Sequence, residues 1–334
     1  MRGLRVHQVG PGVAVQDLGR PGYLAKGLTR GGAADLLAVQ EGAALLAQSP
    51  DCAVLEMVGT GGTFEATEDM VIALTGAAMT ASIDGSAVAW NASHALPAGV
   101  PLVIGPTRDG TYGYLHVSGG FATDPVLGAR ATHQSTGLGA LVAQGDVLPV
   151  GTGAAQPGMT LPRDARFAGG LVRIVPSMQT EDFSVDTRRR FENTVFQRDP
   201  RANRQGVRMD SDQGFSNPDQ LSVVSEVIVL GDIQIAGDGA PFVLLAESQT
   251  TGGYPRIGTV LPCDLPRVVQ APAGVKLRFS FVTLDEGIAA QARANAAWGG
   301  LRKAVTPLVR NPAEMQDLLS YQLVGGVVSA LDEG

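Results

Sequence analysis

The sequence predicts a mainly β protein, and three observations support this prediction. Apolar residues make up 44% of the 334 residues, so the chain can bury a sizeable core. The 44 glycines and 20 prolines are scattered rather than periodic, which is typical of many turns between short strands. Short apolar segments are frequent, whereas few stretches have helical spacing. We therefore expect strands to supply most of the core.

The net charge is −7, which argues against nucleic-acid binding, because that function depends on Lys and Arg to neutralise phosphates. Charged residues reach only 17%, compared with about 25% in typical soluble domains. The low charge favours a large buried surface, either in a core or against partner proteins. The most apolar charge-free run, residues 70–83, is shorter than the roughly 20 residues that span a bilayer. We expect a cytoplasmic protein that binds neither nucleic acid nor membrane.

The N-terminal part is predicted to contain strands and one helix. Helically spaced apolar residues follow Asp35, and Pro50 ends the pattern, so we expect this helix at about 33–47. Asp84-Gly85 is typical of a hairpin turn. The expected strands are 4–9, 13–15, 53–58, 62–66, 70–74, 79–83, 88–90 and 101–104.

The C-terminal part is predicted to combine further strands with two helices. Residues 151–170 are rich in Gly, Pro, Ala and Thr, which indicates a long surface loop. Helices are expected at 182–193 and 285–298, and a short helical pattern lies around 315–319. The expected strands are 112–117, 171–175, 223–230, 233–235, 241–246, 256–261 and a pair within 270–281. We expect a β-rich subdomain at 1–110, a second at 111–285, and a C-terminal helix and tail at 286–334.

Four polar stretches lie on glycine turns beside the predicted strands. In the first, Asp17 and Arg20 offer an acceptor and a donor, although an ion pair that braces the loop would explain them equally well. The second places Arg130 and His133 on a loop. The third contains Arg204 and Arg208 around a glycine, which could clamp an anion or form a surface pair.

The fourth stretch, residues 247–255, connects two apolar strands. A plain connector needs only turn residues, yet this one carries an amide, hydroxyls, two glycines and a phenol. Such groups suit a binding site, because glycines let a ligand approach the backbone. A glycine turn whose hydroxyls bond its own backbone is the alternative.

Several familiar catalytic patterns are absent from the sequence. The chain has no P-loop, no Gly-x-Gly-x-x-Gly and no Gly-x-Ser-x-Gly motif. It also lacks the Ala/Val-Met-Lys-Met motif of biotinylation, so we expect no covalently bound biotin. Its two cysteines lie far apart and its four histidines are isolated, which argues against a metal site built from them. These absences favour a binding subunit or a shared active site over a self-sufficient hydrolase.

The polar stretches occur together, in the same order, in one known family. They read QDLGRPG at 16–22, LGARAT at 127–132, NRQGVR at 203–208 and QTTGGYP at 249–255, with Glu226, Gly231, Gln234 and Asp264 also in place. The chain thus resembles the KipA or allophanate-hydrolase-subunit-2 family, which includes the C subunit of 5-oxoprolinase and the carboxyltransferase part of urea carboxylase. Gln205 and Val207 depart from the usual Met and Tyr of this family, and 133–135 replaces a segment that usually contains tyrosine.

This resemblance implies a cyclophilin-like β-barrel, a second β-rich subdomain and a few short helices. It implies partners similar to KipI, as the B subunit, and to the LamB/YcsF proteins, as the A subunit. It also implies ATP-dependent opening of 5-oxoproline to glutamate by the complex. We expect the isolated chain to be inactive. The alternatives are a carboxyltransferase that acts on a small amide with carboxybiotin from a partner, and a non-catalytic antagonist of a KipI-like protein.

The hypothesis assigns roles to residues that lie on loops beside glycines. Asp17 and Asp264 are the candidates for proton transfer. Arg204 and Arg208 would hold an anionic group, and Gln249, Thr250 and Tyr254 would orient the amide. The full set of expected substrate-binding residues is Gln16, Arg20, Arg130, Asn203, Arg204, Arg208, Gln234, Gln249, Thr250, Thr251 and Tyr254.

Overall fold

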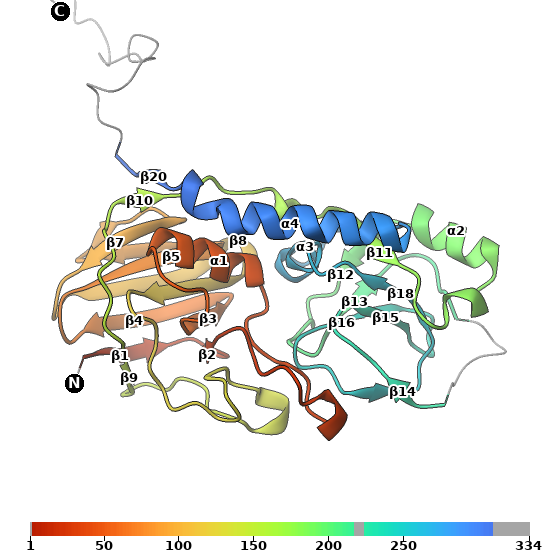
Figure 1. Cartoon of the computed structure of the whole chain (residues 1–334), viewed down its shortest axis with the longest axis horizontal. Helices are drawn as coiled ribbons and strands as arrows, with labels where there is room; N and C mark the ends of the chain where they lie inside the picture. Colours follow the sequence, from red (N-terminus) through yellow and green to blue (C-terminus); the bar gives the residue numbers. More distant parts are fainter. Residues whose placement is uncertain (1, 217–223, 310–334) are drawn as a thin grey trace, which may run out of the picture.

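The computed structural model describes residues 2–216 and 224–309, which form two β bodies (Figure 1). One body is an 11-stranded sheet, and the other is a closed barrel of seven strands. The prediction of a mainly β fold with a barrel and a second β-rich subdomain is therefore confirmed. None of the helices in the described part of the chain is long and apolar enough to cross a membrane.

The first body is built around the antiparallel pair β5 and β8, which runs from Ile72 opposite Val117 to Ile83 opposite Leu102. Its main path is β20-β10-β7-β5-β8-β4-β1-β9, while β2 and β3 continue from β8 and β6 pairs with β5. The strands are β1 Gly3–Val9, β2 Ala14–Gln16, β3 Val54–Val58, β4 Thr60–Ala66, β5 Met70–Ile83, β6 Ser86–Ala87, β7 Ala92–Leu96, β8 Pro101–Val117, β9 Val147–Pro149, β10 Met159–Thr160 and β20 Thr306–Pro307.

The structure corrects several strand predictions in this body. β5 and β8 are each one long strand where we expected two, because register shifts between Gly76 and Ala81 interrupt the alternation without ending the strand. The strand expected at 88–90 is absent, and β7 begins instead after Asn91, whose φ of 58° makes a turn. β9 and β10 were missed because they are only three and two residues long.

The second body is the barrel, with strand order β11-β18-β15-β16-β13-β12-β19. Phe191, Phe196, Phe215 and Phe279 pack in its core with ring centroids 5.1–5.7 Å apart. β14 Glu226–Val227 and β17 Thr251–Gly252 form a separate ribbon. The barrel strands are β11 Gly170–Val175, β12 Phe196–Arg198, β13 Gly206–Asp210, β15 Asp232–Ile235, β16 Pro241–Leu244, β18 Arg256–Val260 and β19 Lys276–Phe281.

Two strand predictions in the barrel are also corrected. Of the strand expected at 223–230, only β14 forms, and residue 223 lies outside the described residues. The pair expected within 270–281 is the single strand β19, because α3 Leu265–Gln270 precedes it. β12 was missed, and β13 lies in a stretch that we expected to be a loop.

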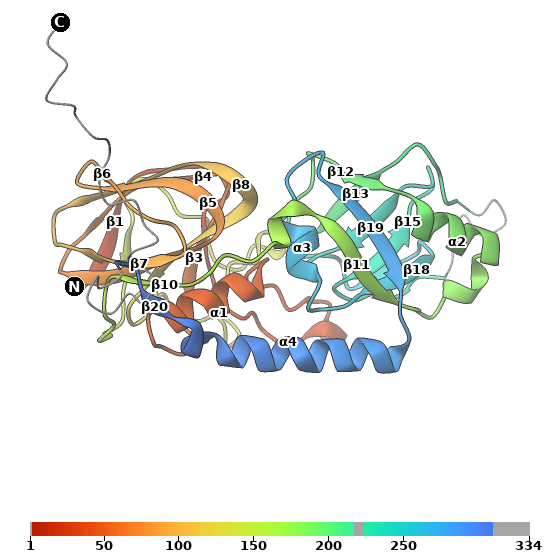
Figure 2. The same ribbon diagram turned by 90° about the horizontal axis from the view of Figure 1, so that it is seen from above.

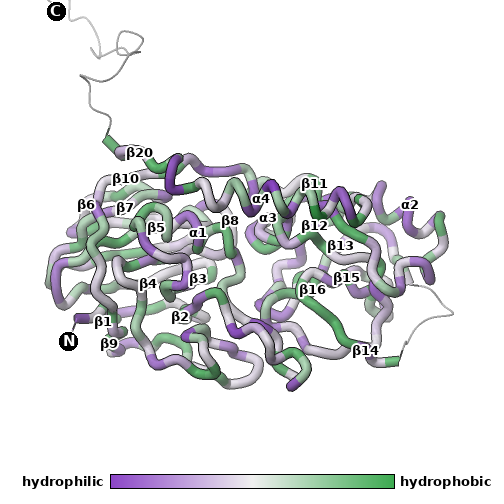
Figure 3. Tube along the Cα trace, viewed as in Figure 1, coloured by the Kyte–Doolittle hydropathy of each residue, from purple (hydrophilic) through white to green (hydrophobic). Residues whose placement is uncertain are grey.

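The predicted helices are confirmed. α1 Leu36–Leu45 begins at the cap Asp35, which accepts a hydrogen bond from the Ala38 amide at 3.1 Å. α2 Val185–Asn193 is hydrophilic along most of its length (Figure 3) and buries only Phe191. α4 Leu284–Ala304 extends beyond the predicted end and runs along both bodies (Figures 1 and 2). The pattern at 315–319 lies outside the described residues. The 3₁₀ turns are η1 Leu24–Lys26, η2 Gln134–Thr136, η3 Arg166–Ala168 and η4 Thr180–Asp182.

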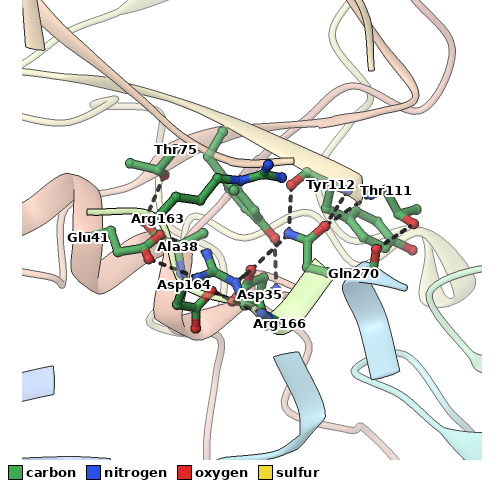
Figure 4. A network of polar contacts seen from close by, with 12 residues as sticks. Asp35, Ala38, Glu41, Thr75, Thr111, Tyr112, Arg163, Asp164, Arg166 and Gln270 are labelled. Carbon is green, nitrogen blue, oxygen red and sulfur yellow. Dashed lines mark hydrogen bonds and ion pairs between the residues drawn. The ribbon is translucent and has the colours of Figure 1, made fainter. Parts of the chain in front are cut away.

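A buried polar network joins the two bodies (Figure 4). Arg166 follows β10 and donates to Asp35 at 2.8 Å and to both oxygens of Glu41 at 2.8 and 2.7 Å. Gln270 of α3 donates to the same Asp35 and to the Tyr112 carbonyl, each at 2.8 Å. Position 110, where we expected the first subdomain to end, lies inside β8, so the bodies divide later, between β10 and β11.

Candidate functional site

The largest group of expected binding residues lines one polar pocket on the barrel. We call this cavity of about 350 Å³ the barrel pocket. β13, β15 and β16 form its walls, and the loop before β17 borders it, so strands hold Arg208, Gln234 and Phe242 in place. Its lining residues are Asp199, Arg201, Asn203, Gln205, Gly206, Arg208, Ile228, Gln234, Phe242, Leu244, Ser248 and Gln249.

A second polar cavity of about 390 Å³ adjoins the barrel pocket, and we call it the junction pocket. Gln205, Ser248 and Gln249 line both cavities, so the two are adjacent. Loops of the first body contribute Thr29 and the segment after His133, while the barrel contributes the loop at 247–251. The remaining lining residues are Gly27, Thr29, His133, Ser135, Thr136, Glu247, Thr250 and Thr251.

Two buried polar atoms of the barrel pocket have no hydrogen-bond partner among the described residues. They are Nε2 of Gln234 and Oγ of Ser248, in side chains that are 8% and 5% exposed. Burying a polar group without a hydrogen-bond partner costs roughly 1–3 kcal/mol of stability. Both atoms are therefore positions where a hydrogen bond from a ligand would offset this cost. Gly252 makes room for the Gln234 amide, because a Cβ there would lie 2.4 Å from Nε2.

Arg208 and Asn203 lie at the barrel pocket as expected, but both already have intramolecular partners. Arg208 donates to Asp210 at 2.9 Å and to Asp238 at 2.7 Å, and its side chain is 29% exposed. Asn203 accepts hydrogen bonds from the Gln205 and Gly206 amides, which fixes the turn into β13. The two residues therefore shape the pocket wall.

Arg204 does not face the barrel pocket, which corrects the expectation that it clamps an anion. Its guanidinium is buried between two carboxylates, Glu56 of β3 and Glu247, and it also donates to the Gly32 carbonyl. Because two negative charges already surround it, the pKa of Arg204 is raised above its ordinary value despite burial. Arg204 is thus an ion-pair bridge between the two bodies.

Both carboxylates that we expected to transfer protons are committed to local hydrogen bonds. Asp17 accepts from the Gly19 amide at 2.7 Å and from the Arg130 amide at 2.6 Å. Asp264 accepts from Arg173 through the backbone amide at 2.8 Å and through Nε at 2.9 Å and Nη2 at 2.6 Å. The geometry therefore gives both side chains a structural role, since neither is among the residues that line the two pockets.

The other expected residues of the first body hold loops together. Gln16 donates to the Thr132 carbonyl at 3.0 Å, and Arg130 donates to the Thr123 carbonyl at 2.9 Å. Arg20 donates to the Val126 and Ala131 carbonyls, and it lines a smaller cavity of about 190 Å³ that also contacts Ser248. Tyr254 is 47% exposed and lies outside the lining of both pockets. Gln249, Thr250 and Thr251 do line the junction pocket.

His133 is a buried residue in the lining of the junction pocket. Its side chain is 1% exposed, and its Nδ1 lies 3.9 Å from Oε2 of Glu247. Glu247 also accepts from the Ser135 amide at 3.1 Å, so it holds the turn that follows His133. Burial lowers the pKa of His133, while the neighbouring Glu247 partly opposes this effect.

The sequence did not single out several pocket residues. Asp199 and Arg201 line the barrel pocket as a local ion pair, and hydrogen bonds from Arg201 lower the pKa of Asp199 to about 2. Ser248 and Glu247 lie directly before Gln249, so the polar stretch did contain them, but nothing local distinguishes an unpaired Ser248 from a paired one. Their importance depends on burial, which arises only when the two bodies meet.

The chain matches one protein family and two known relatives over most of its length. The model of the carboxyltransferase domain, subdomains A and B, matches residues 26–281. The chain is 29% identical to the C subunit of 5-oxoprolinase from Escherichia coli K12 over 292 residues, covering 86% of this chain and 94% of that protein. It is 28% identical to the C subunit of 5-oxoprolinase from Haemophilus influenzae over 277 residues, covering 81% and 89%.

Solved structures share the fold. The crystal structure of TTHA0988 superposes with a TM-score of 0.77 at 28% identity, covering 84% of this chain and 55% of that one. The Kluyveromyces lactis urea carboxylase superposes with a TM-score of 0.81 at 19% identity, covering 93% and 31%. The chain therefore spans about half of the first structure and about a third of the second.

Proposed function

Because the chain belongs to the family of carboxyltransferase domains composed of subdomains A and B, we propose that it is the C subunit of a 5-oxoprolinase-type hydrolase. Its similarity, over most of both chains, to proteins named as the C subunit of 5-oxoprolinase supports this proposal. In this function the complex opens the lactam of 5-oxoproline to glutamate with consumption of ATP, and this chain contributes the small-amide site.

The observation that carries the proposal is the pair of unpaired buried groups in the barrel pocket. Gln234 Nε2 is a donor and suits a carbonyl oxygen, whereas the Ser248 hydroxyl can donate or accept. A lactam presents one carbonyl acceptor and one N–H donor side by side, so the two protein groups match its two hydrogen-bonding edges. The rigid strand β15 holds Gln234, which fixes the direction of its amide.

We assign the use of ATP to a partner protein. The arginines of the barrel pocket are already neutralised, Arg201 by Asp199 and Arg208 by Asp210 and Asp238. A triphosphate carries several negative charges and would lie beside these three carboxylates, so the pocket suits it poorly. The proposed partners are a KipI-like B subunit and a LamB/YcsF-like A subunit.

Co-expression with these partners tests the proposal. The assembled complex should release glutamate from 5-oxoproline only when ATP is present. Replacing Gln234 with Leu removes a hydrogen bond worth about 0.5–1.5 kcal/mol, so KM should rise roughly threefold to tenfold while the thermal stability is kept. Gln197→Leu, on the exposed part of β12, is the matched control and should leave KM unchanged.

An assembled complex that releases no glutamate would overturn the 5-oxoprolinase assignment. The match to a carboxyltransferase domain favours the second candidate, transfer of a carboxyl group from a partner's carboxybiotin to a small amide. Labelled bicarbonate, a biotin carboxylase and a biotinylated carrier would then yield a labelled carboxylated amide. A complex without either activity would leave the role of an antagonist that only binds a KipI-like protein.

A further inference from the structure

The tautomer of His133 follows from its hydrogen bonds. Its Nε2 lies 2.9 Å from Oγ1 of Thr29, and that hydroxyl donates to the Ser248 carbonyl at 3.1 Å. Placing the imidazole proton on Nε2 lets His133 donate to Thr29 while Thr29 keeps its 3.1 Å hydrogen bond to the Ser248 carbonyl, and this favours the Nε2–H tautomer. In the neutral ring, Nδ1 therefore has a free lone pair.

Two hydroxyls face that lone pair. Oγ of Ser135 lies 3.2 Å from Nδ1, and Oγ1 of Thr136 lies 3.1 Å from it. Each hydroxyl has a carbonyl as an alternative acceptor, at 3.4 Å for Ser135 and 3.3 Å for Thr136, which are longer contacts. Ser135 and His133 both line the junction pocket, but Ser135 is exposed, whereas His133 is buried.

Three charged groups surround the imidazole. Glu247 favours the protonated ring, while Arg20 and Arg204 disfavour it. Burial adds to the effect of the arginines, so the ring is neutral near pH 7 and can accept a proton. Once protonated at Nδ1, it would face Oε2 of Glu247 at 3.9 Å, which would stabilise the positive charge.

We propose that Ser135 and His133 form the proton acceptor of the junction pocket, with Ser135 as the catalytic hydroxyl and His133 acting through it. This inference rests on the proposed hydrolase function. A water bound in the junction pocket, where Ser248 and Gln249 also border the lactam site of the barrel pocket, gives a proton to Ser135 Oγ while the Ser135 proton moves to His133 Nδ1. The water oxygen bonds to the lactam carbonyl carbon, the C–N bond breaks, and the proton returns from Nδ1 through Ser135 to the departing nitrogen. This step adds one water to the lactam, and the ATP that the complex consumes is used by the partner protein, as proposed above.

Nitrogen NMR of the isolated full chain tests the arrangement without any activity. Long-range proton–nitrogen spectra distinguish the two tautomers, and His133→Asn identifies its signals among the four histidines. We expect the Nε2–H tautomer. The double variant Ser135→Ala/Thr136→Val removes the donors that stabilise the neutral ring, so the pKa of His133 should rise. An Nδ1–H tautomer, or an unchanged pKa in the double variant, would overturn the proposal.

The pH dependence of the assembled complex tests the catalytic role. We expect Ser135→Ala/Thr136→Val to lower kcat at least 100-fold with KM within about twofold, because a positioned base contributes roughly 10²–10⁴-fold. His133→Asn should remove the acidic limb of the kcat profile, and the control Gln197→Leu on β12 should keep both the rate and the limb. If His133→Asn lowers kcat but leaves the acidic limb of the pH profile unchanged, the role of His133 is purely structural. If the wild-type complex lacks activity on 5-oxoproline, the proposed function fails, while the tautomer measurement still decides the hydrogen-bond arrangement.

Discussion

Arg204 and Arg208 lie four residues apart, yet their surroundings differ in a way that separates structure from function. Arg204 is 7% exposed and bonds Glu56, Glu247 and the Gly32 carbonyl, which come from both bodies. Arg208 is 29% exposed, bonds only barrel residues and borders the barrel pocket. A charge that is buried and fully paired between the bodies holds the fold together, whereas a paired and partly exposed charge on the barrel wall shapes the pocket.

The position of β13 explains the difference. Arg204 precedes the strand, where the chain passes the loop at 31–34 of the first body. Arg208 lies within β13, opposite Phe242 of β16, and its guanidinium lies 5.6 Å from the centre of that ring. Identical side chains therefore acquire different roles because one lies at the contact of two bodies and the other on the barrel wall.

The strongest test of this contrast is the pair Arg204→Met and Arg208→Met. Removing Arg204 leaves Glu56 and Glu247 buried without their cation, which should cost about 3–5 kcal/mol of unfolding free energy. Removing Arg208 breaks ion pairs with Asp210 and Asp238, carboxylates that are 47% and 53% exposed, and should cost roughly 0–1 kcal/mol. Denaturant unfolding of the three proteins measures both values.

Equal losses from the two variants would contradict the contrast. So would a fully stable Arg204→Met chain that loses only substrate affinity, because this would return Arg204 to the role of an anion clamp. Arg204→Lys adds a control that keeps the positive charge. A lysine side chain cannot reach all three acceptors of Arg204. The stability of this variant should therefore lie between that of the wild type and that of Arg204→Met.

The loop of Asp17 is the second place to test the distinction between structural and functional polar groups. Asp17→Ala removes the acceptor of the Gly19 and Arg130 amides and should cost roughly 1.5–3 kcal/mol. Because this carboxylate is not among the residues that line the two pockets, kcat of the folded complex should stay within about twofold. A stable variant with a loss of 100-fold or more would restore Asp17 as a proton-transfer residue.

The sequence predicted the β-rich fold well because glycine turns and apolar alternation are local signals. It predicted α1 from the helical spacing of apolar residues after Asp35, and the resemblance predicted the barrel. It did not predict that β5 continues through its bulges, since a bulge resembles a strand end. For the candidate site, Gln234 and Gln249 were expected to bind substrate and do line the barrel pocket, whereas the partners of Arg204 were not predicted. Those partners are Glu56 and Glu247, distant in sequence, and only the docking of the two bodies brings them together.

The smallest expected effect concerns the local pair Asp199–Arg201 at the rim of the barrel pocket. Hydrogen bonds from Arg201 lower the pKa of Asp199 from its ordinary value to about 2. A lowered pKa contributes stability above pH 4, and this contribution disappears as the pH falls from about 4 to 2, because the unfolded chain takes up the proton first.

Asp199→Asn should lack this dependence, so the stability difference between wild type and variant should shrink as unfolding is measured from pH 5 to pH 3. Arg201 is 80% exposed, so 1 M salt should reduce the difference further. A difference that stays constant with pH and salt would mean that the charge pair of Asp199 and Arg201 contributes nothing to stability.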